Sequence, residues 1–198
     1  MGASDSHVRI EGAHADELAR AAVDGDAAAL DAFYAALKER NFNRGPHFGL
    51  HLGVEVLEVA ANRVVMRLPW RREVQRGGGI FHGGAIMALA DHVAGCVFNT
   101  DPRIFASGTT GLTTDFSASF LRAAEPGDAL VATGTVLRRG RNVVFMQVDV
   151  RSDPSNRAVA ICRTTYVVVP RERVRRGVRK LEQSESSDEH TRSRPKSR

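Results

Sequence analysis

Apolar and polar positions alternate with a period of two through much of the second half of the chain. The segments with this pattern are rich in β-branched residues and span 112–121, 129–137, 143–151 and 158–169. Alternation and β-branching both favour strands. Short connections containing Gly, Pro, Asp and Asn separate the segments, and such connections are typical of antiparallel pairing. Two earlier runs, 53–59 and 63–68 around the turn Ala61-Asn62, predict a hairpin.

Two other segments have helical patterns. An apolar stripe with i, i+3, i+4, i+7 spacing falls on Leu30, Phe33, Tyr34 and Leu37. Asp26 is a suitable N-cap for that helix. The second segment, residues 85–99, is apolar nearly all round, which is typical of a helix in the middle of a domain. One buried helix and several antiparallel strands predict an α+β domain in which a curved sheet packs against that helix.

Composition divides the chain into three parts. Residues 1–45 are expected to form a helical extension, because Ala-rich sequence leads into a loop with Asn, Gly and Pro at 41–49. Residues 46–170 hold the predicted sheet and buried helix. Residues 171–198 form a basic tail, with ten of the 28 Lys and Arg but only five of the 23 Asp and Glu. From residue 176 onward the tail has few apolar residues, so we expect disorder there.

The charge distribution argues against the nucleic-acid binding that a basic chain would suggest. The formal net charge is +5 and the pI is about 9.9, but the 170 residues before the tail carry 18 basic and 18 acidic residues. We therefore expect no nucleic-acid binding by the folded domain. Cys96 and Cys162 provide no disulfide framework, and there is no signal sequence or long apolar stretch. A cytoplasmic protein without a membrane span is expected.

The glycine-rich loop before the buried helix is the most informative segment, and it runs Gly77-Gly78-Gly79-Ile80-Phe81-His82-Gly83-Gly84. A phosphate-binding loop would need Gly-Lys-Ser/Thr at its end, and Ala follows Gly84. A dinucleotide site would need a third glycine at position 82 within a parallel α/β unit. Two interpretations stay open. Gly83 and Gly84 allow close helix–sheet packing, or their N–H groups form an anion or oxyanion site that a substrate carbonyl can approach.

Asp91 lies near the centre of the apolar helix. A charged carboxylate there would cost several kcal/mol if nothing compensated it. It must therefore be hydrogen-bonded, lie at the edge of the core, or take part in chemistry. His92 and Cys96 are more typical of structural residues. No metal is expected, because the only suggestive spacing, His47 and His51, is interrupted by residues that disfavour a helix.

Several motifs together resemble the PaaI-like hotdog-fold acyl-CoA thioesterases over about residues 46–170. They are His82-Gly83-Gly84 with Asp91 nine positions after the His, Gly111-Leu112-Thr113-Thr114-Asp115-Phe116, Pro126-Gly127-Asp128 and Arg138-Arg139-Gly140-Arg141. The Pro-x-x-His segment of hotdog hydratases and the His-Phe-Pro-Gly loop of acyl-carrier dehydratases are absent. The resemblance implies a helix wrapped by an antiparallel sheet, a homodimer or homotetramer, and hydrolysis of an acyl-CoA without a cofactor.

The resemblance also implies roles for individual residues. The helix Asp of this family acts as general base or nucleophile, which gives Asp91 that role. The N–H of Gly83 would form the oxyanion hole, with Gly84 beside the substrate. His82 would orient the thioester, and Thr113 would help to place the attacked group or water.

Four arginines bear on how the substrate would be bound. The family usually carries Asn six positions before the motif His, where it hydrogen-bonds in the active site, and this chain has Arg76. Its rate and acyl preference therefore need not follow the family. Arg138, Arg139 and Arg141 lie on a turn where the family often has basic residues near the CoA phosphates, although a turn rich in Arg is also an ordinary solvated surface.

Two functions stay open at this point, an acyl-CoA thioesterase and a non-catalytic hotdog module that binds acyl-CoA as a sensor or scaffold. Helix geometry bears on how a catalytic site would be built. If the helix begins at Gly83, Asp91 lies roughly 12 Å further along its axis, and His82 and Asp91 fall on opposite sides. One chain can hardly direct both at one thioester, whereas a two-fold dimer can combine Asp91 of one subunit with His82 of the other.

Overall fold

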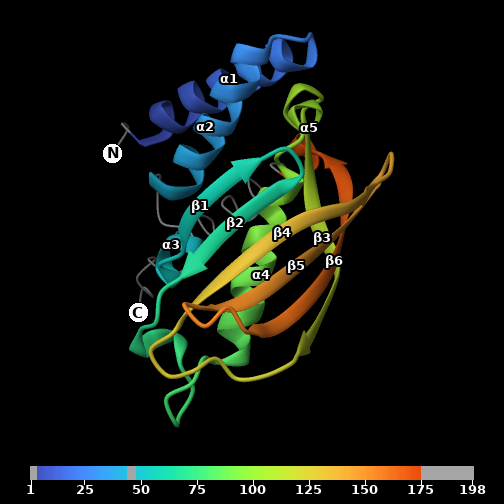
Figure 1. Ribbon diagram of the computed structural model, residues 1–198. Helices are drawn as coiled ribbons and strands as arrows, with labels where there is room; N and C mark the ends of the chain where they lie inside the picture. Colours follow the sequence, from blue (N-terminus) through green and yellow to red (C-terminus); the bar gives the residue numbers. More distant parts are fainter. Residues whose placement is uncertain (1–3, 44–47, 175–198) are drawn as a thin grey trace, which may run out of the picture.

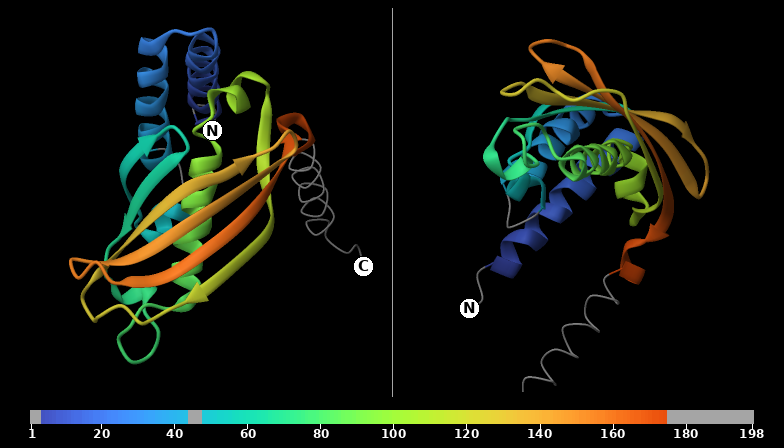
Figure 2. Two further views of the ribbon diagram at one scale, coloured as in Figure 1. Left: turned by 45° about the vertical axis from the view of Figure 1, so that its right-hand side comes forward. Right: turned by 90° about the horizontal axis from the view of Figure 1, so that it is seen from below.

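The computed structural model describes residues 4–43 and 48–174. Its centre is a six-stranded antiparallel sheet with the order β1-β2-β4-β5-β6-β3. The strands are β1 (Glu55–Ala60), β2 (Arg63–Leu68), β3 (Thr109–Phe120), β4 (Ala129–Arg139), β5 (Val143–Asp153) and β6 (Ala158–Pro170). The sheet curves around one long helix, α4 (Gly83–Phe98) (Figures 1 and 2). The predicted α+β architecture, with its hairpin, four strands and central helix, is confirmed.

Helix α4 is held in the concave side of the sheet by its apolar side chains. Leu89, Val93 and Val97 are fully buried, and Ala90 and Ala94 between them are small enough to let the helix approach the sheet. The sheet residues in the same core cluster come from the inner face of the central strands and include Val64, Met66, Leu130, Val144, Met146 and Val148. Alternate residues of each strand face the helix, which explains the period of two in the sequence.

The extension before the domain is a helical hairpin, α1 (Ser4–Val23) and α2 (Ala27–Asn43), which packs at one end of the sheet (Figure 1). The Asp26 carboxylate accepts a hydrogen bond from the Ala29 N–H at 3.0 Å, so Asp26 caps α2 as predicted. The apolar stripe in the sequence predicted only α2, and α1 before it is a second helix of the extension.

A second, smaller core joins this hairpin to the domain. It consists of Ala15, Ala19, Phe33, Leu37 and Phe105. Arg171, just after β6, forms an ion pair with Asp16 at 2.9 Å and lies 4.6 Å from the centroid of the Phe105 ring. The first residue of the expected tail therefore ties the extension to the end of the sheet, while residues 175–198 of that tail lie outside the described residues.

Three short elements were not predicted, α3 (Phe48–Leu52), α5 (Pro102–Ala106) and the 3-10 turn η1 (Arg72–Val74). Asp101 caps α5 by accepting from the Arg103 N–H at 3.0 Å, and Pro occupies the first helical position. This Asp-Pro pair is a recognised helix-start signal that the sequence analysis missed. The predicted bounds of the loop at 41–49 are wrong at both ends, because α2 ends at Asn43 and α3 begins at Phe48.

A close approach between helix and sheet occurs at Gly134 on β4. A Cβ at this position would lie 2.6 Å from Val93 Cγ1 and 2.6 Å from Val97 Cγ2. Both distances are far below van der Waals contact, so the missing side chain determines how near α4 lies to β4.

We expect Gly134→Ala to lower the free energy of unfolding by about 1–3 kcal/mol, because the added methyl overpacks the core. Urea unfolding followed by circular dichroism measures this change. Gly77→Ala is the matched control, since a Cβ at Gly77 meets no atom within 4 Å. An unchanged unfolding midpoint for Gly134→Ala would contradict the described packing of α4 on β4.

Candidate active site

His82 forms the N-cap of α4. The Nδ1 atom of its ring accepts a hydrogen bond from the Gly84 N–H at 2.9 Å, and the backbone N–H of His82 donates to the Val74 carbonyl at 2.9 Å. An Nδ1 that accepts carries no proton, so the ring proton is on Nε2. Because the side chain is exposed, that Nε2–H can donate to a ligand.

The two glycines after His82 differ in how their N–H groups are used. His82 takes the Gly84 N–H, whereas no hydrogen bond within the described part of the chain uses the Gly83 N–H. As the first residue of α4, Gly83 presents this N–H at the positive end of the helix. Of the two glycines, Gly83 therefore has the N–H that is available to an oxyanion.

Close packing excludes a side chain at Gly84 but not at Gly83. A Cβ on Gly84 would lie 2.9 Å from His82 Nδ1, so Gly84 is needed for the N-cap. A Cβ on Gly83 would meet the Phe120 ring at 3.5 Å, which is an ordinary contact. Close packing alone therefore does not account for glycine at position 83.

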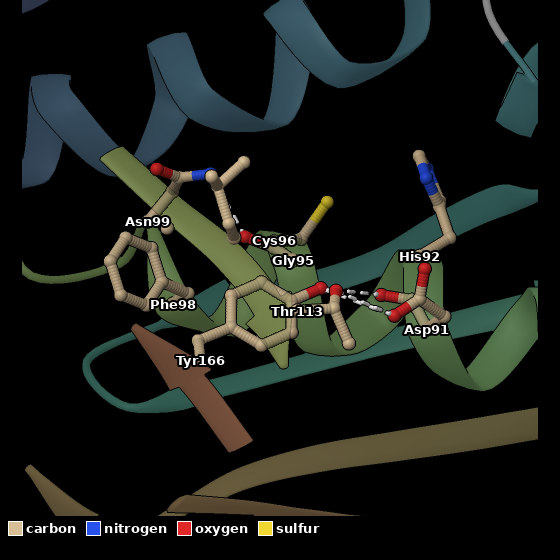
Figure 3. A pocket seen from close by; sticks show the side chains of 10 residues that line it. Asp91, His92, Gly95, Cys96, Phe98, Asn99, Thr113 and Tyr166 are labelled. Carbon is tan, nitrogen blue, oxygen red and sulfur yellow. Dashed lines mark hydrogen bonds between the residues drawn. The ribbon is translucent and has the colours of Figure 1, made fainter. Parts of the chain in front are cut away.

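Asp91 lies two turns further along α4, on the side that faces β3 and β6. Thr113 Oγ1 donates to Asp91 Oδ1 at 3.2 Å. The Tyr166 hydroxyl lies 3.3 Å from the same Oδ1 and 3.4 Å from the Asp91 carbonyl oxygen. Figure 3 shows both hydroxyl groups pointing toward Asp91. Asp91 is exposed, so its carboxylate is hydrogen-bonded at the edge of the core and is not a buried, uncompensated charge.

Strand pairing brings the two hydroxyl groups together. Thr113 and Tyr166 are opposite each other in the β3–β6 ladder, so their side chains leave the sheet on the same face. The register shifts between Thr113 and Asp115, which leaves Thr114 as the extra residue of a bulge. Bulges often lie beside active sites, where they change the direction of a side chain and interrupt regular pairing.

An open pocket of about 380 Å³ adjoins Asp91. This volume is within the range of small-molecule sites. Besides the three hydrogen-bonded residues, much of its lining is apolar or small, namely Gly95, Cys96, Phe98, Gly111 and Leu112. The pocket can therefore receive an apolar group next to a carboxylate.

Cys96 and His92, which lie near Asp91 on α4, have surroundings typical of residues with a structural role. Burial raises the pKa of the Cys96 thiol to about 12, so the thiol stays protonated near neutral pH and is no nucleophile. The His92 ring points away from Thr113 and Tyr166 in Figure 3. It packs against α3, where a Cβ on Gly49 would lie 2.5 Å from His92 Nε2.

Arg76, the departure from the family motif, lies in the tight loop before α4. Its N–H donates to the Ile80 carbonyl at 2.9 Å, and its carbonyl accepts the Gly79 N–H at 3.2 Å. The side chain is exposed and its Nε lies 3.4 Å from the Gly77 carbonyl oxygen. Within the described residues it makes no hydrogen bond to Asp91.

The three arginines of the β4–β5 turn have different surroundings. Arg138 and Arg141 are exposed, whereas the side chain of Arg139 is only 14% exposed. Arg139 Nε pairs with Asp101 Oδ2 at 3.2 Å, and its Nη2 donates to the Phe98 carbonyl at 3.3 Å. Arg139 therefore joins β4 to the end of α4 and the start of α5.

The partner of Arg139 is itself a buried, ionised group. Burial raises the pKa of Asp101, but hydrogen bonds from Arg103 and the charges of Arg139 and Arg103 outweigh it, so the net pKa lies below its usual range. Asp101 is thus a carboxylate at neutral pH and needs its cationic partners.

Removal of Arg139 should affect stability, and removal of its neighbours should not. We expect Arg139→Ala to lower the free energy of unfolding by about 1–3 kcal/mol, because it deprives a buried carboxylate of a partner. Arg138→Ala and Arg141→Ala should change it by less than about 0.5 kcal/mol. Thermal unfolding measures these differences. Equal destabilisation by Arg138→Ala and Arg139→Ala would contradict these assignments.

Tyr166 was not among the residues identified from the sequence. It lies 75 positions from Asp91 and belongs to a strand in which an aromatic residue is unremarkable. The only signal was the pairing of the Thr113 segment with the last strand, and that pairing cannot be read from a local pattern.

The described residues contain no group of three or more His, Cys, Asp or Glu side chains that could hold a metal ion. His47, one of the two histidines considered above, lies outside the described residues. None of the described helices is both long enough and apolar enough to cross a membrane.

Known proteins share both the sequence pattern and the fold. The model of the thioesterase superfamily matches residues 78–159, from the glycine-rich loop into β6. A Deinococcus radiodurans protein named as a candidate esterase is 31% identical over 124 residues, which cover 61% of this chain and 73% of the relative. The chain belongs to the thioesterase superfamily. Human acyl-coenzyme A thioesterase 13 is 26% identical over 132 residues, 66% of this chain and 87% of the human protein.

Solved structures of this superfamily have the same hotdog fold. A Haemophilus influenzae thioesterase matches with a TM-score of 0.60 at 23% identity, over 70% of this chain and 91% of that one. The PaaI protein of Escherichia coli matches with a TM-score of 0.56 at 19% identity, over 80% and 95% of the two chains. A Streptococcus pneumoniae hypothetical thioesterase, solved with coenzyme A, matches with a TM-score of 0.52 at 25% identity, over 59% and 86%. The predicted hotdog fold and PaaI-like resemblance are confirmed.

Proposed function

We propose that this protein hydrolyses an acyl-CoA to free CoA and a carboxylic acid, with Asp91 as general base or nucleophile. The observation that carries the proposal is the exposed Asp91 carboxylate, hydrogen-bonded through one oxygen and placed beside an open pocket. Two relatives support CoA as part of the substrate, the human protein named as an acyl-CoA thioesterase and the S. pneumoniae protein solved with coenzyme A.

The geometry of Asp91 suits either chemical role. Both hydroxyl groups contact Oδ1, and within the described residues no hydrogen bond reaches Oδ2. As a general base, Oδ2 takes a proton from a water while the water oxygen bonds to the thioester carbon. As a nucleophile, Oδ2 attacks that carbon and forms an anhydride that water then hydrolyses. In both cases the C–S bond breaks and CoA leaves as a thiolate.

The start of α4, β3 and the β4–β5 turn would supply the remaining groups of the proposed site. The Gly83 N–H would stabilise the negative charge that develops on the thioester oxygen. The His82 Nε2–H would hold the thioester in position, and Thr113 would help to hold Asp91 or the attacked group. Arg138 and Arg141, whose side chains are exposed, are available to the phosphates of CoA.

One chain cannot provide all of these groups to one thioester. Gly83 and Asp91 are eight residues apart on α4, or about 12 Å along its axis. Reacting atoms must come within about 3–3.5 Å of each other. We therefore propose that each site combines Asp91 of one subunit with His82 and Gly83 of a second copy, in a homodimer that can associate further into a tetramer.

The surface between α4 and β3 suits such a dimer. β3 is an edge strand of the sheet, and among the described residues no strand pairs with its outer side. Two large apolar side chains along this surface are exposed, Met87 at 40% and Phe120 at 51%. Met87 lies one helical turn from both Gly83 and Asp91, so burying this surface would place the second copy beside the proposed site.

Asp91→Asn should keep the fold and lower kcat by roughly 10²- to 10⁴-fold, the usual worth of a positioned base. Release of free CoA, followed with a thiol reagent over a panel of acyl chains, measures the rate. Asp149→Asn is the matched control, because Asp149 lies on β5 with Gln147 as its hydrogen-bond partner. Near-full turnover by a folded Asp91→Asn variant would rule out the assignment.

The same assay tests the alternative, a hotdog module that binds acyl-CoA without turnover. Arg76 favours this alternative, since it stands where the family has an active-site Asn. Binding of acyl-CoA in calorimetry, with no release of thiol by the wild-type protein, would establish a sensor or scaffold in place of an enzyme.

Mixing two inactive variants tests the shared site. Asp91→Asn and His82→Ala chains, unfolded and refolded together, should regain about a quarter of the wild-type activity, because half the dimers are mixed and each mixed dimer has one intact site of two. Mass spectrometry of the intact complexes confirms that mixed dimers form. If they form and remain inactive, the two residues act within one chain.

A further inference from the structure

We infer that Tyr166 is a positioning residue for Asp91, whose phenol holds the carboxylate so that Oδ2 faces the pocket. This inference rests on the proposed role of Asp91. The phenol oxygen lies 3.3 Å from Asp91 Oδ1 and 3.4 Å from the Asp91 carbonyl oxygen. Both acceptors belong to Asp91, so donation to either one ties β6 to this residue of α4.

The Tyr166 ring is held in place by packing and not by its contact with Asp91. The residue is only 6% exposed. A Cβ on Gly111 would lie 2.7 Å from Tyr166 Cδ2, and a Cβ on Gly95 would lie 3.3 Å from its hydroxyl oxygen. The Phe98 ring lies next to it, with 5.6 Å between ring centroids. These neighbours therefore fix the position of the ring.

The identity of residues 95 and 111 agrees with this packing. Gly95 lies inside α4 and Gly111 inside β3, and neither has a positive φ. Glycine in the interior of a helix or strand is destabilising relative to alanine, so a turn or unusual backbone conformation does not explain either one. Room for the Tyr166 hydroxyl accounts for Gly95, and room for the Tyr166 and Phe98 rings together accounts for Gly111.

Tyr166 can act as a hydrogen-bond donor near neutral pH. Burial raises the pKa of its phenol and the nearby carboxylate of Asp91 raises it further, and together they outweigh the lowering effect of a hydrogen bond with Thr113. The phenol therefore keeps its proton. A protonated phenol and the Thr113 hydroxyl can both donate to Oδ1, which leaves the lone pairs of Oδ2 for water or the thioester carbon. Side chains locked by packing are the ones that hold a catalytic group to within a fraction of an ångström.

The test is a double-mutant cycle between Tyr166→Phe and Asp91→Asn. Tyr166→Phe removes one buried oxygen and should lower kcat about tenfold or more while KM changes less than about twofold, as expected for loss of a hydrogen bond to a charged group. In the Asp91→Asn background the same change should have no further effect on kcat. Tyr34→Phe, the matched control on α2, should leave kcat and KM unchanged.

Gly95→Ala provides a second route to the same question. Its Cβ would lie close to the Tyr166 hydroxyl and displace it without removing it. We expect kcat to fall in the wild-type background and to stay constant in the Asp91→Asn background. Circular dichroism and melting temperature show whether each variant is folded.

Three results would overturn the inference. They are wild-type kcat in Tyr166→Phe, an equal loss of kcat in both backgrounds, which indicates a merely structural role, and a rise in KM in both backgrounds, which indicates direct contact with the substrate. Failure of the proposed function gives a different result: either the wild-type protein binds acyl-CoA without releasing thiol, or Asp91→Asn alone retains turnover whatever Tyr166→Phe does.

Discussion

The close contact between α4 and the inner face of the sheet determines where every group of the proposed site lies. Fully buried Leu89, Val93 and Val97 press the helix against the strands, and Gly134 on β4 lets it come within contact distance. This position sets the Gly83 N–H at one end of the helix and brings the middle of the helix next to β3 and β6. Asp91 then meets hydroxyl groups from two strands without being buried. The same packing that stabilises the domain therefore also arranges the chemistry.

The local parts of this structure could be predicted from the sequence. The alternating segments became strands, the all-apolar segment became α4, and Asp26 caps α2 because capping depends on residues only a few positions apart. His82, Gly83 and Asp91 were identifiable for the same reason, since the loop and helix that carry them are continuous. The resemblance to a known family added Thr113, which lies on a different element, and the structure places it in contact with Asp91.

The parts that depend on distant contacts could not be predicted. Tyr166 reaches Asp91 only because β6 pairs with β3 in one register, and a shift of one residue would turn its side chain to the outer face. Arg139 and its neighbours formed one basic turn in the sequence, yet the bulge between Val136 and Arg138 and the carboxylate of Asp101 set Arg139 apart as an internal ion-pair partner. No charge pattern along the chain distinguishes these arginines.

The shared site can be seen in a crystal structure of the Asp91→Asn variant with an intact acyl-CoA. We expect the thioester oxygen to lie about 3 Å from the Gly83 N–H of one subunit. We also expect the side chain at position 91 of the second subunit to face the thioester carbon, with Tyr166 behind it. A thioester bound away from both groups, or held by both groups of a single chain, would rule out a site shared between two subunits.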